Sequence, residues 1–156
     1  MNKRKIKDLF LICFTFMFSY SVLGQKADDI LGFWISENAA TGFEIYKSQN
    51  KYFSKIVWLA QPNVNGKPKL DKNNVDISKR DKPLLGTIIL SGLVFDKDEW
   101  NDGTIYNAKD GKTYKVYLQL DGKNLNVIGF KGSRWLSKIN TWYPVQDKSK
   151  FPERDE

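Results

Sequence analysis

The chain has 156 residues, with no histidine, a single cysteine and a formal net charge of +7. Without histidine there is no imidazole general base and no histidine-based catalytic triad, and one cysteine cannot form a disulfide within the chain. Part of the positive charge lies at the N-terminus, so its meaning depends on how that segment is interpreted.

The first 24 residues have the three parts of a secretory signal peptide. A basic head at positions 2–7 precedes a short apolar run from Leu9 to Phe18, and smaller residues follow up to Gly24. The apolar run is shorter than an ordinary membrane span, and we expect no transmembrane span in the rest of the chain. We predict cleavage after Gly24 and export to the periplasm or the extracellular space. An uncleaved amphipathic anchor is the alternative.

Removal of these 24 residues leaves 132, which suits one domain with one core. Cys13 leaves with the signal peptide, together with four basic residues and one acidic residue, so the net charge falls from +7 to +4. This mild excess does not predict a nucleic-acid partner. Because neither thiolate nor imidazole ligands remain, only metals with oxygen ligands stay open. The acidic residues offer no adequate ligand set, so we expect no metal site and no cofactor. We also expect a monomer.

Strand-like segments recur along the rest of the chain after a lead-in at Lys26–Ile30 that has the length of one helical turn. About eight such segments are separated mostly by short turns: 32–37, 43–47, 52–59, 84–95, 104–107, 113–120, 125–130 and 139–145. Consecutive strands on short turns pair antiparallel, and eight in succession favour an up-and-down barrel without exposed edges. We therefore predict an all-β barrel domain over 25–146, followed by a flexible charged tail over 147–156.

One of these strand pairs, 104–107 with 113–120, flanks the turn Ala108-Lys109-Asp110-Gly111. Asp-Gly is typical of a β-hairpin turn, because glycine accepts positive φ and aspartate hydrogen-bonds to the nearby backbone. A calcium loop is the alternative for the acidic residues just before it. Counting from Asp98, however, the third ligand position falls on Trp100, which offers no oxygen. We predict a structural hairpin.

One segment, Gln61 to Pro83, interrupts the succession of strands with three prolines and several asparagines. A loop of this length in a compact domain is usually either functional or disordered. A flexible, solvated excursion is the interpretation we favour, and a lid over a binding site is the alternative.

Five short patterns occur in order along the chain: Gly32-Phe33-Trp34, Arg80-x-x-Pro83-Leu84-Leu85-Gly86, Trp100-x-x-Gly103-x-Ile105-Tyr106-Asn107, Gly111-Lys112-x-Tyr114 and Asn140-Thr141-Trp142. With these patterns the chain resembles a family of small exported bacterial proteins known as domain of unknown function 2147. It is similar in turn to the calycins, the superfamily of lipocalins and fatty-acid-binding proteins. The resemblance implies an exported barrel and carries no assigned activity.

The calycin resemblance also implies a way of closing the barrel. In calycins the tryptophan of a Gly-x-Trp motif closes the floor under a basic side chain from the last strand. That maps to Trp34 beneath Lys138, an ammonium over an indole face. Ser137-Lys138 stands where the family usually has Gly-Arg, and Pro144 replaces a common arginine.

A barrel of about eight strands is wide enough for packed side chains or for one small ligand. We predict a non-enzymatic binding module for a small apolar or amphipathic molecule. The candidate ligand-lining residues are Glu44, Tyr46, Trp58, Tyr106, Tyr114, Arg134 and Trp142. Arg134 is the expected anchor for a carboxylated ligand. Glu44 is a possible polar handle unless it faces solvent or pairs with a strand lysine.

Two other classes remain open. The first is an envelope interaction or structural protein with a filled barrel, which exposure of Trp100 and Trp135 would favour. The second is a carboxylate-based hydrolase, but nothing in the spacing of the acidic residues selects a catalytic pair. The volume of the barrel interior distinguishes a binding module from a filled barrel.

Overall fold

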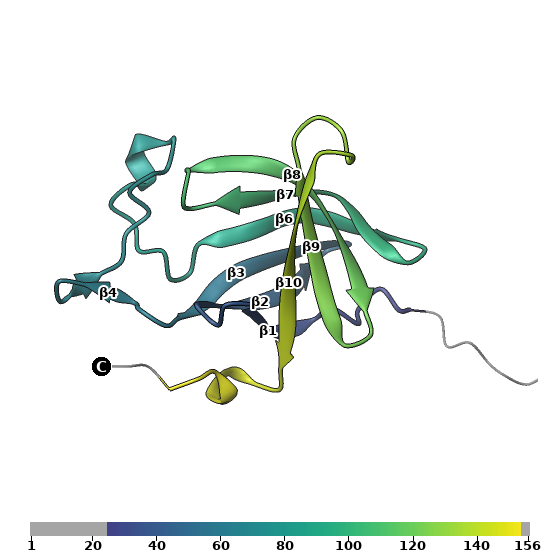
Figure 1. Ribbon diagram of the computed structural model, residues 1–156, viewed down its shortest axis with the longest axis horizontal. Helices are drawn as coiled ribbons and strands as arrows, with labels where there is room; N and C mark the ends of the chain where they lie inside the picture. The colour runs from purple at the N-terminus through teal and green to yellow at the C-terminus, as the bar shows by residue number, and fades with distance from the viewer. Residues whose placement is uncertain (1–24, 154–156) are drawn as a thin grey trace, which may run out of the picture.

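In the computed structural model, which describes residues 25–153, eight strands form a closed antiparallel barrel (Figure 1). The strands are β1 (Gly32–Ser36), β2 (Thr41–Ser48), β3 (Lys51–Leu59), β6 (Ile88–Asp96), β7 (Glu99–Asn107), β8 (Lys112–Asp121), β9 (Asn124–Phe130) and β10 (Ser137–Val145). Each pairs with its neighbours along the chain, and β1 closes the barrel on β10. This confirms the predicted all-β, up-and-down fold. The predicted signal peptide and its cleavage site lie outside the described residues.

The N-terminal lead-in closes one end of the barrel. It forms a single turn, in which the Asp29 amide donates to the Lys26 carbonyl at 3.1 Å, as the sequence predicts. Two indole N–H groups hold this turn against the barrel. Trp34 donates to the Ile30 carbonyl and Trp100 to the Ala27 carbonyl, each at 2.9 Å.

Bulky side chains fill the barrel above that turn. Trp100 is fully buried, and the ring of Tyr52 meets it edge-on at 6.4 Å between centroids. The other inward residues packed at full burial include Ile45, Leu90, Leu93, Leu118, Leu125 and Val127. Each large apolar side chain buried in this way contributes about 1.5–3 kcal/mol. This half of the barrel is therefore a packed core, and any interior space lies towards the other end.

Two irregularities in the strands set which side chains face inward. Gly92, with φ +77°, lies where the register between β3 and β6 shifts, as expected of a bend or bulge in a long strand. A second shift, between Gly42 and Phe43 on β2, leaves Val57 of β3 without a partner. Because one extra residue reverses the alternation, Trp58 turns to the outer face.

The predicted hairpin between β7 and β8 is present. Gly111 has φ +70°, and its amide donates to the Asn107 carbonyl at 2.8 Å. A Cβ at this position would lie 1.6 Å from the carbonyl oxygen of Asn73, in the long loop. Glycine therefore serves both the turn geometry and the close approach of a second segment.

The segment after β10 is packed on the barrel as far as Phe151, unlike the free tail expected from its charges. A short 3-10 helix, η2 (Lys148–Lys150), leads to Phe151, which is buried. Its ring stacks on Trp58 at 5.6 Å and meets Phe33 edge-on at 6.2 Å. It also fills the space left by the absent side chain of Gly42.

No helix within residues 25–153 is long and apolar enough to cross a membrane.

Candidate ligand cavity at the open end of the barrel

The end of the barrel opposite the N-terminal turn holds a cavity of about 1870 Å³ that opens to solvent. Its buried and half-buried lining is apolar. It comes from strands around the barrel and from Leu84 in the loop before β6, and it also includes Phe43, Ile56, Leu59, Ile89, Ile105 and Trp142. The rings of Phe43 and Trp142 stack face to face, with centroids 3.8 Å apart. An apolar wall of this kind suits the apolar part of a ligand.

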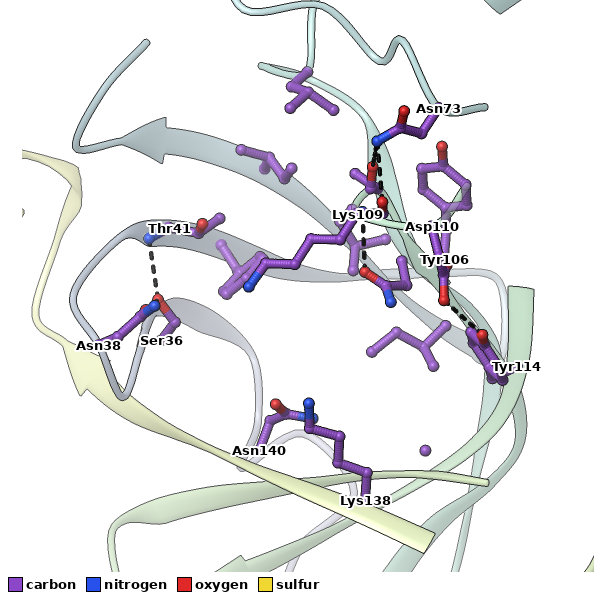
Figure 2. Close-up of a pocket in the computed structure, with 18 of the residues that line it drawn as sticks. Ser36, Asn38, Thr41, Asn73, Tyr106, Lys109, Asp110, Tyr114, Lys138 and Asn140 are labelled. Atoms are coloured by element: carbon purple, nitrogen blue, oxygen red, sulfur yellow. Dashed lines mark hydrogen bonds between the residues drawn. The ribbon is translucent and has the colours of Figure 1, made fainter. Parts of the chain in front are cut away.

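The exposed lining of the same cavity is basic. It contains six lysines, Lys67, Lys69, Lys72, Lys109, Lys131 and Lys138, against the two carboxylates of Glu37 and Asp110. Figure 2 shows Lys109 reaching across the cavity from the β7–β8 turn and Lys138 pointing towards it from β10. Within residues 25–153 none of the six forms a salt bridge. The mouth therefore has a positive potential that attracts anions.

The Asp110 carboxylate is engaged within its own hairpin. It accepts a hydrogen bond from the Tyr114 hydroxyl at 2.6 Å (Figure 2). It accepts another from the Lys112 amide at 3.0 Å. The Tyr114 hydroxyl lowers the pKa of Asp110, and the carboxylate in return raises the pKa of Tyr114. Asp110 is therefore ionised at neutral pH, and it fixes the ring of Tyr114 on the cavity wall.

The long loop between β3 and β6 folds over one side of the mouth. It contains a small hairpin, β4 (Asn63–Val64) with β5 (Lys67–Pro68), and the 3-10 turn η1 (Ile77–Lys79). Several residues of its first half line the cavity. The packing of this loop favours the lid interpretation over the solvated excursion.

A buried carboxylate fastens this lid to the barrel. Asp71 is only 3% exposed and accepts hydrogen bonds from the Tyr106 hydroxyl at 2.5 Å and the Asn74 amide at 2.7 Å. Burial raises the pKa of Tyr106, and the Asp71 carboxylate raises it further, so the hydroxyl keeps the proton that it donates. Nearby, Asn73 donates to the Lys109 carbonyl at 3.0 Å (Figure 2). We call the Asp71–Tyr106 contact the lid latch.

Comparison with known proteins places the chain in a family. Residues 32–143 match the model of the family described as "Uncharacterized protein conserved in bacteria (DUF2147)". The chain belongs to this family. Among solved structures it is similar to a Helicobacter pylori protein described as belonging to the lipocalin family, with a TM-score of 0.64 and 23% identity. That similarity covers 76% of this chain and 84% of the other and concerns the fold. No curated protein matches the sequence.

The structure places three of the seven candidate lining residues of this DUF2147 protein on the cavity wall: Tyr106, Tyr114 and Trp142. Trp142 is buried on β10, and the two tyrosines come from the strands of the β7–β8 hairpin. Their positions follow from the hairpin and from the alternation of β10.

Three of the other candidates lie on the outer surface of β2 and β3. Phe43 and Ile45 occupy the inner face of β2, so alternation turns Glu44 and Tyr46 outward. Glu44 pairs with Lys55 at 3.0 Å, and the same ammonium lies 5.4 Å from the centre of the Tyr46 ring. Glu44 is thus the partner of a strand lysine and no handle for a ligand. Trp58 packs outside because of the bulge at Val57.

Arg134 also lies outside the cavity. Its guanidinium pairs with Glu99 at 3.0 Å and stacks over the Tyr117 ring at 4.0 Å, and it also contacts Asn101. The prediction that Arg134 anchors a ligand in the barrel is therefore wrong.

The predicted closure of the barrel by Trp34 and Lys138 is wrong as well. Trp34 is buried in the floor as expected, but its partner in the register with β10 is Pro144. Lys138 lies six residues before Pro144 on β10, which places it about 20 Å from Pro144 at strand spacing. It belongs to the lysines of the mouth, whereas the floor is held by the indole bond to Ile30.

Proposed function

We propose that this protein binds one small amphipathic anion in the open half of its barrel. The apolar part of the molecule occupies the interior, and its anionic group meets the lysines of the mouth. The observation that carries the proposal is the combination of an apolar interior wall with six lysines that have no acidic partner in residues 25–153.

The size and lining of the cavity support a ligand with a hydrocarbon portion. Small-molecule sites have volumes of roughly 300–1,000 Å³, and the 1870 Å³ here includes the open mouth. Each CH₂ group moved from water into an apolar site contributes about 0.8 kcal/mol, about a fourfold gain in affinity. Affinity should therefore rise with chain length until the apolar half is full.

We infer binding without catalysis. Histidine and cysteine are absent from residues 25–153, which leaves carboxylates for acid–base work. Glycosidase-type catalysis needs one carboxyl group with a raised pKa. In the lining, the Tyr114 hydroxyl shifts the pKa of Asp110 in the opposite direction.

Isothermal calorimetry with alkyl sulfates of increasing chain length tests the proposal. The informative variant is Gly129→Phe, because Gly129 lines the cavity and a Cβ there meets only ordinary contacts, with Ile105 at 3.5 Å. We expect the added ring to fill the interior and abolish binding. Lys138→Ala should weaken binding about tenfold, and its control, Lys123→Ala at the opposite end, should leave it unchanged.

Two results would contradict the proposal. One is the absence of any binding across the chain-length series. The other is equal affinity for the wild type and the Gly129→Phe variant, which would place any bound molecule on the outer surface.

A further inference from the structure

One tryptophan of the protein is exposed to solvent, whereas the other four are buried. Trp135 is 88% exposed, whereas Trp34, Trp58, Trp100 and Trp142 are all buried. The next residue, Leu136, is 71% exposed. Both lie in the connection between β9 and β10, which projects from the barrel as a long loop (Figure 1). Adjacent large apolar side chains at such exposure contribute little to the core and are typical of an interaction site.

The loop that carries these side chains is held in place. Arg134 stacks on Tyr117 and pairs with Glu99, which ties the loop to the outer wall of β7 and β8. Within the loop, the Leu136 amide donates to the Ser133 carbonyl at 3.1 Å and forms a turn. The turn directs the two apolar side chains to solvent while the charged residue before them faces the barrel.

Basic residues flank the apolar pair. Lys131 and Lys138 lie on either side of it along the chain, and both line the mouth of the cavity. Across the mouth the lid adds Lys67, Lys69 and Lys72, together with Val64, which is exposed. The acidic residues nearest in sequence to the apolar pair, Asp121 and Asp147, are both more than ten positions away. The surface thus combines an indole, an aliphatic side chain and several cations.

We propose that the β9–β10 loop docks the mouth of the barrel on an anionic lipid bilayer. An indole and a leucine side chain enter the interfacial region of a bilayer readily, because tryptophan places an apolar ring and a polar N–H at the same level. Lysines beside them are attracted to anionic head groups within about one Debye length. Charge complementarity therefore favours a lipid surface over the uncharged apolar groove of another protein.

The docking brings the cavity against the bilayer, since the loop and the lid both line its mouth. An amphipathic molecule could then pass between membrane and barrel without crossing water. This consequence rests on the proposed ligand, but the docking itself depends only on the exposed loop and the lysines.

Flotation with phospholipid vesicles tests the docking. The vesicles contain either phosphatidylcholine alone or phosphatidylcholine with about one quarter phosphatidylglycerol. We expect binding to the anionic vesicles, weakened at about 0.5 M salt, and little binding to the neutral ones. Trp135→Ala should reduce partitioning about tenfold, and folding should be unaffected because the side chain is exposed. Acrylamide quenching of the tryptophan fluorescence should fall on binding, because Trp135 is the exposed indole.

Lys131→Glu and Lys123→Glu form a matched pair, since both reverse one charge and Lys123 lies at the closed end. The first should weaken binding to anionic vesicles and the second should not. Alkyl sulfate binding is measured without vesicles in parallel, so that failure of the cavity and failure of the docking are scored separately. Equal partitioning of the wild type and Trp135→Ala would overturn the proposal. So would binding only to membranes that retain their proteins, which would indicate a protein partner.

Discussion

The lid latch yields the sharpest stability prediction, because the β7–β8 hairpin holds another hydroxyl–carboxylate pair in more exposed surroundings. Tyr106 donates to Asp71, which is 3% exposed, and Tyr114 donates to Asp110, which is exposed. Tyr106→Phe leaves a buried carboxylate oxygen without that partner. Hydrogen bonds to charged groups contribute about 1.5–3 kcal/mol, so we expect a loss of about 2 kcal/mol in the free energy of unfolding.

Tyr114→Phe is the matched control, since it removes the same atom from a bond that water replaces easily. It should cost about 0.5 kcal/mol or less. Urea unfolding followed by circular dichroism measures both changes. Limited trypsin digestion then reports on the lid, whose lysines should be cut faster in Tyr106→Phe than in Tyr114→Phe. Equal unfolding free energies and equal cleavage rates for the two variants would refute the latch.

The latch also has a pH signature. Burial and the Asp71 carboxylate raise the pKa of Tyr106 above its ordinary value of 10.0, so folding favours the protonated hydroxyl. Its contribution to stability is complete below pH 10 and decreases as the pH rises through the higher folded-state pKa. Wild-type stability should therefore fall more steeply above pH 10 than that of Tyr106→Phe. Parallel pH profiles in this range would show that the hydroxyl is not buried against a carboxylate.

Three further predictions concern the barrel frame, and all are measured by urea unfolding. Trp34→Ala should cost about 3–5 kcal/mol, Lys138→Ala should cost less than about 0.5 kcal/mol, and the two effects should add, because the residues do not touch; a coupling energy above about 1 kcal/mol would restore the calycin-like closure. Gly111→Val should destabilise the protein by several times more than Ala108→Val, because residue 111 has a positive φ and a side chain there would collide with a neighbouring carbonyl. Similar unfolding midpoints for the two variants would place the tight turn elsewhere. Phe151→Ala should cost about 3 kcal/mol and shift tryptophan emission to the red as a stacked indole becomes exposed; an unchanged spectrum would mean that the tail is not docked.

The fold could be predicted from local signals in the sequence. Turn dipeptides such as Asp110-Gly111 and the alternation within each strand depend on nearby residues alone, and together they give the number and direction of the strands. Which face of each strand turns inward depends on the hydrophobic pattern together with the register of the whole sheet. Alternation separates Phe43 and Ile45 from Glu44 and Tyr46, and the two wholly apolar side chains favour burial of the first pair. The prediction that Glu44 and Tyr46 line the interior runs against this hydrophobic pattern.

The errors at the site come from features that span the barrel. The unpaired residue Val57 in β3 turns Trp58 outward, and no local sequence pattern predicts that bulge. The distance between Trp34 and Lys138 depends on how far β1 is displaced along β10, which closure of the sheet decides. The sequence gives one sign that Phe151 packs on the barrel, because it is a lone aromatic residue within a charged segment. The site that receives it, however, is the space beside Gly42 on a strand distant in sequence.

Native mass spectrometry of the protein purified from the cells that produce it tests the central claim most directly. The wild type should carry one additional species of a few hundred daltons, and negative-ion spectra of the extracted molecule should show an acidic group joined to a hydrocarbon portion. Gly129→Phe, purified in the same way, should lack it, because the added ring occupies the interior. A wild-type protein that carries no such species and binds no alkyl sulfate on titration would contradict the account of the barrel as a ligand-binding module.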